Sequence, residues 1–64
     1  MTVKTAVGAI TATKPVLNSI ALAYYSGAYR YEREGAYGMC RYYRKIGEQI
    51  HDALEVTGYY MEDK

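Results

Sequence analysis

The stretch that decides the fold covers residues 36–57 and reads AYGMCRYYRKIGEQIHDALEVT. Its apolar side chains recur in steps of three and four residues, which is the spacing of a helical packing seam. The seam consists of Ala36, Met39, Tyr43, Ile46, Ile50, Ala53 and Thr57, widened by Leu54 and Val56. Gly58 follows as a helix stop. The pattern predicts an α-helix about 33 Å long.

A second helix is predicted upstream, over residues 15–34. Pro15 suits its first turn, Gly35 offers a stop, and Gly27 would bend or split it. One face would carry Leu17, Ile20, Tyr24, Ala28 and Tyr31, and a second face Leu22, Tyr25 and Tyr29. No residue from Pro15 to Tyr29 is charged, and a helix that is apolar on most sides is normally buried on most sides. One other helix cannot cover it, so the sequence predicts a homodimer or a tightly bound partner.

Residues 1–14 read MTVKTAVGAITATK and favour an extended arm or a short strand, because Thr and Val prefer extended backbone. Gly8 weakens any regular element there. The short connection around Gly35 predicts that the two helices pack antiparallel. The predicted fold is therefore all-α or mainly α. It is one small domain with an arm (1–14), an antiparallel helical hairpin (15–58) and a tail (59–64).

The composition makes stability a problem. The 64 residues include only fourteen large aliphatic side chains, and a domain this short buries only about 60% of its unfolded surface. A single Cys excludes an intrachain disulfide, which leaves buried tyrosine or association as the stabilising device. Nine Tyr stand beside no Phe and no Trp. Six of them, predicted to mark where something else binds, lie off the seams or near the ends: Tyr25, Tyr29, Tyr37, Tyr42, Tyr59 and Tyr60.

Charge nearly cancels over the whole chain, at +1, but it is unevenly distributed. Residues 29–45 carry five Arg or Lys against two Glu, a net +3, whereas residues 46–64 carry a net −4. The second helix therefore begins basic and ends acidic, opposite to the preference of its dipole. Stability does not explain this order, which indicates a partner or head-to-tail pairing of two copies.

Catalytic and metal-binding patterns are weak. Cys40 and His51 are the obvious nucleophile and base, but eleven residues of helix separate them by about 16 Å, and a catalytic pair needs about 3 Å. Cys40 is interpreted as a small apolar side chain flanking the seam. Glu48 and His51 have the spacing of di-iron bundle ligands, but the register puts both on the solvent face, where Glu55 supports them. We expect no enzymatic activity, no cofactor and no metal.

Membrane insertion is not expected. Lys14 and Pro15 interrupt the uncharged stretch, and neither half reaches the roughly 18 to 20 apolar residues of a spanning helix. A single free thiol agrees with a cytoplasmic location.

Tyrosines and arginines interleave around the predicted turn between the helices. Protein interfaces are enriched in both residues, and single-stranded nucleic acid is bound by the same pair through stacking and phosphate neutralisation. Because the net charge there is only +3 and an acidic segment follows, a protein partner is favoured over nucleic acid. The predicted partner-binding residues are Tyr25, Tyr29, Arg30, Arg33, Tyr37, Arg41, Tyr42 and Arg44.

The order of an N-terminal strand and two helices resembles the ribbon-helix-helix repressors, obligate dimers whose strands enter the major groove. That resemblance implies that either Thr2, Lys4 and Ala6 or Thr5, Val7 and Ala9 face the bases, and most of these side chains read bases poorly.

The favoured function is a small non-enzymatic protein-interaction module that binds and blocks or adapts a larger protein complex. By analogy with other very short, tyrosine-rich chains, this would be a phage or mobile-element inhibitor of a host or defence machine. The alternative is a dimeric nucleic-acid-binding protein that uses its strand or a Tyr/Arg stacking surface.

Overall fold

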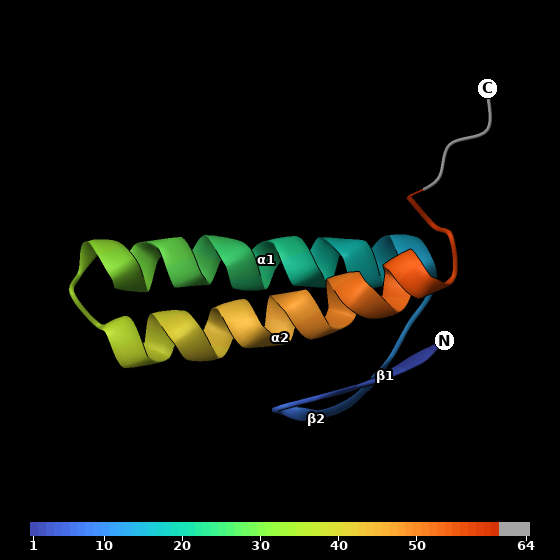
Figure 1. Cartoon of the computed structure of the whole chain (residues 1–64), viewed down its shortest axis with the longest axis horizontal. Helices are drawn as coiled ribbons and strands as arrows, with labels where there is room; N and C mark the ends of the chain where they lie inside the picture. The colour runs from blue at the N-terminus through green and yellow to red at the C-terminus, as the bar shows by residue number, and fades with distance from the viewer. Residues whose placement is uncertain (61–64) are drawn as a thin grey trace.

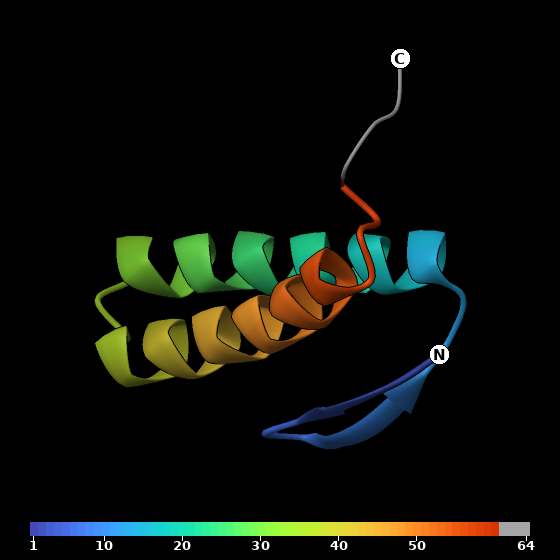
Figure 2. The ribbon, with the colours of Figure 1, turned by 45° about the vertical axis from the view of Figure 1, so that its right-hand side comes forward.

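The computed structural model describes residues 1–60 of the chain (Figure 1). Along the sequence it contains β1 (Thr2–Thr5), β2 (Gly8–Thr11), α1 (Lys14–Arg33) and α2 (Tyr37–Val56). The two helices lie side by side as an antiparallel hairpin, and the two strands form a β-hairpin along one side of them (Figures 1 and 2). The predicted mainly α fold is confirmed, and every helix end lies within one residue of its predicted position.

Both helices stop at the predicted glycines. Gly35 has φ +81° and Gly58 has φ +78°, in the left-handed region that a Cβ disfavours. The next backbone N–H in each case folds back on the helix. Ala36 donates to the carbonyl of Tyr31 at 2.8 Å, and Tyr59 donates to that of Leu54 at 3.2 Å. These bonds satisfy carbonyls that the helix ends would otherwise leave free.

The N-terminal arm is a two-stranded antiparallel hairpin rather than a single strand. Gly8, which we expected to weaken regular structure, begins β2. In the register Thr2 lies opposite Thr11, and their hydroxyls are 2.7 Å apart. Val3 lies opposite Ile10 on the inner face, because side chains alternate along a strand. β1 therefore pairs within its own chain, unlike the single N-terminal strand that a ribbon-helix-helix likeness implies.

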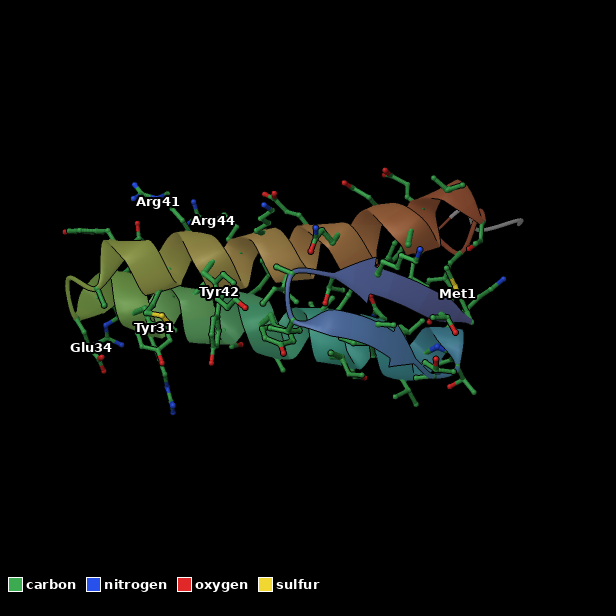
Figure 3. The ribbon with its side chains drawn as sticks, turned by 90° about the horizontal axis from the view of Figure 1, so that it is seen from below. Met1, Tyr31, Glu34, Arg41, Tyr42 and Arg44 are labelled. Atoms are coloured by element: carbon green, nitrogen blue, oxygen red, sulfur yellow. The ribbon has the colours of Figure 1, made fainter. Side chains whose placement is uncertain are left out.

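The β-hairpin is fastened to α2 at its tip. The backbone N–H of Ala6, in the turn between the strands, donates to Oε1 of Gln49 at 2.9 Å. Val3, only 4% exposed, enters the core beneath α1 and α2. Seen from below, the hairpin covers the half of the helix pair that lies away from the α1–α2 turn (Figure 3).

The core is aliphatic and lies under that cover. Its buried members are Val3, Leu17, Ala21, Ile46, Ile50 and Leu54. The predicted seam of α2 is correct in its middle and wrong at both ends. At the start Cys40 is buried and Met39 is 41% exposed, and at the end both Val56 and Thr57 are exposed. A strict seam has 3.5 residues per turn and a straight helix has 3.6, so the buried stripe drifts around α2.

Two glycines bring tyrosine rings between the helices. A Cβ at Gly27 would lie 2.6 Å from Cδ2 of Tyr43, and a Cβ at Gly47 would lie 3.2 Å from Cε2 of Tyr25. Each helix therefore supplies one glycine over which a tyrosine of the other helix packs. The expected split at Gly27 is wrong, because α1 is continuous from Lys14 to Arg33.

Candidate functional site

A shallow hollow on the surface lies along α1. It is an open groove of about 780 Å³, lined by Leu22, Tyr25, Ser26, Tyr29, Arg30 and Arg33. These positions are three or four residues apart and so share one side of the helix. Four of the eight predicted partner-binding residues meet here. Leu22 and Ser26 were not among those eight, although their helical spacing to Tyr25 and Tyr29 was a signal that could have found them.

The rim of the groove combines an exposed ring with a cation. Tyr29 is 61% exposed, and the guanidinium carbon of Arg33 lies 5.8 Å from the centre of its ring. That geometry is a cation–π contact. Leu22, about two turns before Tyr29 in the groove, is 55% exposed. A large aliphatic side chain and a large aromatic one thus face water along an uncharged stretch of α1.

Tyr25 forms the inner wall of the groove. It is half-buried over Gly47, and its ring meets His51 edge-on at 6.2 Å. Burial raises the pKa of the Tyr25 hydroxyl, nearby Glu48 and Asp52 raise it further, and Arg44 lowers it. The acidic side chains of α2 therefore border this part of the groove.

The predicted residues on α2 do not gather into one patch. Tyr37 is 61% exposed, and Arg41 is exposed beside it. Arg44 donates to Sγ of buried Cys40 at 3.7 Å. Arg41 and Arg44 project from the outer edge of α2, whereas Tyr42 lies on the side that carries the β-hairpin (Figure 3). Tyr42 is 39% exposed and its ring lies 6.3 Å from that of Tyr43.

Three tyrosines form a cluster between the helices near the turn, and the sequence did not predict that they contact one another. The ring of Tyr43 meets Tyr24 and Tyr31 edge-on, each at 5.2 Å. Tyr43 raises the pKa of Tyr31, through its charge and through a side-chain hydrogen bond. All three residues were predicted to lie on inner faces. The signal for their contact was Gly27, which makes room for the Tyr43 ring.

The last tyrosines pack inward, contrary to the prediction that they mark a binding surface. Tyr59 and Tyr60 are half-buried against the core, and the hydroxyl of Tyr60 donates to Oδ1 of Asn18 at 2.7 Å. Their rings lie 5.1 Å apart. The rest of the predicted tail, residues 61–64, lies outside the described residues.

The placement of His51 differs from the predicted solvent face. Its ring lies 4.5 Å from that of Tyr60, and it also meets Tyr25. Within residues 1–60, no three His, Cys, Asp or Glu side chains stand close enough together to hold a metal ion. No polar or charged side chain in that range is buried either.

Comparisons of the chain with protein-family models, with curated proteins and with solved structures found no match. Neither described helix combines the length and apolar character that crossing a membrane requires.

Proposed function

We propose that this chain is a small non-enzymatic protein-interaction module that binds a larger protein complex and blocks or adapts it. The observation that carries the proposal is the pair of exposed rings near the α1–α2 turn. Tyr29 and Tyr37 are each 61% exposed. Arg33 lies over the ring of Tyr29, and exposed Arg41 follows Tyr37 by one turn of α2. The phage or mobile-element inhibitor of a host or defence machine is one form of this function.

Exposed tyrosines beside arginines are effective in binding. A tyrosine ring buries a large apolar area with few rotatable bonds, and its hydroxyl can still bond to the partner. Arginine adds directed hydrogen bonds and stacks on aromatic faces. Because Tyr43 and Tyr25 hold the two helices rigidly together across Gly27 and Gly47, binding need not order the backbone that presents these side chains.

The test is affinity capture from the cells that encode the chain, followed by identification of the bound protein. The tagged wild type is compared with a Tyr37→Ala, Arg41→Ala variant. Val56→Ala is the matched control, because Val56 is on the same helix and is 87% exposed. We expect the double variant to lose roughly tenfold or more in affinity and the control to bind normally. Equal retention of the partner by all three proteins would contradict the assignment of this surface.

Nucleic acid is the second candidate, favoured by the five basic residues within residues 29–45. Tyrosine stacking and phosphate neutralisation would both be available around the turn. Such binding weakens steeply as salt rises, because each neutralised phosphate releases counterions. Binding of labelled single-stranded and double-stranded oligonucleotides at low and high salt separates the two functions. No binding at low salt would end the nucleic-acid alternative.

A further inference from the structure

The groove on α1 is an uncovered apolar stripe in the middle of the molecule. From Pro15 to Tyr29 the helix carries no charge. The β-hairpin covers the side of α1 that bears Ile20 and Tyr24, both of which pack against the core. The opposite side exposes Leu22 and Tyr29 to water. The spacing of three and four residues from Leu22 through Tyr25 to Tyr29 is that of a stripe that packs against another helix.

Contacts between the helices fix which residues of α1 and α2 lie level with one another, that is, at the same height along the axis of the helix pair. Gly27 lies against Tyr43, and Tyr25 lies against Gly47. Because α1 and α2 run antiparallel, the residue numbers of level positions add to about 71. Glu48 is therefore level with Ala23, and Asp52 is level with Ser19.

The groove consequently has a basic end toward the turn, and two acidic side chains of α2 lie level with its other end or just beyond it. Arg30 and Arg33 line it toward the turn. Toward the other end, Glu48 and Asp52 of α2 act on Tyr25 in the groove wall. A uniformly acidic or basic partner would be repelled at one end. A partner that carries the same two ends in reverse order would be attracted at both.

We propose that the groove binds a second copy of this chain, with the two α1 helices antiparallel about a two-fold axis that passes between Tyr25 and Ser26. A two-fold interface must be self-complementary, because the same surface meets itself. Arg33 lies about 11 Å along α1 on one side of this axis, and Asp52 lies about 10 Å on the other side. The symmetry brings Arg33 of each copy level with Asp52 of the other, and the two helix pairs form a four-helix arrangement.

This inference goes beyond the proposed function. It assigns Tyr29, which lines the groove, to contact with the second copy and leaves Tyr37 to the larger protein. The second copy occupies the stripe of α1. Tyr37 and Arg41 do not line the groove and remain available to the larger protein. The dimer would therefore present two such surfaces, one on each copy. Bivalent presentation strengthens binding to a target that has two matching sites.

The first test is the mass of the full chain in solution, measured by sedimentation over a range of concentrations. We expect the sedimenting species of the wild type to have twice the 7.3 kDa mass of one chain. Leu22→Glu places a charge in the apolar stripe and should raise the dimer Kd roughly hundredfold or more. Val56→Glu is the matched control, on an equally apolar but remote exposed position, and should leave the dimer intact. Circular dichroism of both variants checks that the helices still form.

The second test is a charge exchange. One variant carries Arg30→Glu and Arg33→Glu, and the other carries Glu48→Arg and Asp52→Arg. In a homodimer of either variant, like charges lie opposite one another. The dimer Kd of each variant should therefore rise roughly tenfold or more. An equimolar mixture restores opposite charges at both ends. We therefore expect the mixture to form a heterodimer with close to wild-type affinity.

Three outcomes would overturn the inference: a wild-type monomer at every concentration, a Leu22→Glu variant that dimerises as the wild type does, or a mixture that does not associate. None of these removes the proposed function, because a monomer could still capture its protein through Tyr37 and Arg41. Conversely, a dimer that captures no protein through that surface supports the inference and contradicts the proposed function.

Discussion

The two halves of the helical hairpin are packed with different side chains. The half under the β-hairpin has an aliphatic core in which Leu17, Ile46 and Ile50 are completely buried. The half near the α1–α2 turn has no strand over it (Figure 3), and Tyr43 fills it, held between Tyr24 and Tyr31. The difference shows how a chain with few aliphatics completes its fold. A strand covers one half, and tyrosines close the other while their hydroxyls can stay near water.

The largest expected effect comes from the aliphatic half. Ile50→Ala leaves a cavity beneath the β-hairpin and should lower the free energy of unfolding by about 2–5 kcal/mol, which is a large part of the stability of so small a domain. Urea unfolding followed by circular dichroism measures it. Cys40→Ala, at a buried position nearer the turn, is the control and should cost much less. Equal losses would show that the two halves are packed alike.

The next effect tests the tyrosine half. In Gly27→Ala the new methyl group would lie 2.6 Å from Tyr43 Cδ2, so the ring must move out of its cluster. We expect a loss of about 1–3 kcal/mol in the free energy of unfolding. Gly38→Ala is the matched control, because nothing lies within 4 Å of its Cβ position. That substitution should be neutral or stabilise α2 by up to about 1 kcal/mol. A Gly27→Ala variant as stable as Gly38→Ala would show that Tyr43 is not confined.

A smaller effect concerns the link between the β-hairpin and the half it covers. Gln49→Ala removes the acceptor of the Ala6 N–H and should cost about 0.5–1.5 kcal/mol. Amide hydrogen exchange should rise most at Ala6 and then along β1 and β2. Lys45→Ala, exposed and one turn earlier on α2, is the control for altered helix propensity. Exchange at Ala6 that matches the wild type would mean that Val3 alone holds the hairpin in place.

The fold followed from the sequence where local signals agreed. Periodicity and the glycine stops located both helices, and Ile46 and Ile50 were placed in the core correctly. The β-hairpin was not foreseen, because its pairing depends on the register that sets Val3 opposite Ile10 rather than on propensity.

The candidate site was only partly predictable for the same reason. Four of its predicted residues share one groove because they lie on one helix, where spacing is sufficient to relate them. Tyr42 lies on the face of α2 that carries the β-hairpin, whereas Arg41 and Arg44 project from its outer edge (Figure 3). The inward packing of Tyr59 and Tyr60 depends on a return of the chain beyond Gly58 toward Asn18, which no periodicity records.

The smallest expected effect is a dependence of stability on alkaline pH. Tyr25 in the groove wall, Tyr60 after α2 and Tyr31 near the turn all have pKa values raised above the ordinary 10.0. Burial is the main cause for Tyr25 and Tyr60, and Tyr43 is the main cause for Tyr31. The unfolded chain therefore loses these protons first. Their contribution to stability is complete below pH 10 and is lost as pH rises through the folded pKa values.

Absorbance titration of tyrosinate measures this difference directly. The native chain should show late-titrating tyrosines that disappear in urea, where all nine ionise together. Glu48→Gln removes one charge that raises the pKa of Tyr25 but leaves its burial over Gly47 unchanged. That variant should therefore shift the Tyr25 titration toward the ordinary value without changing Tyr31. Coincident native and denatured curves would contradict the prediction, because Tyr25, Tyr31 and Tyr60 would then ionise as freely as in an unfolded chain.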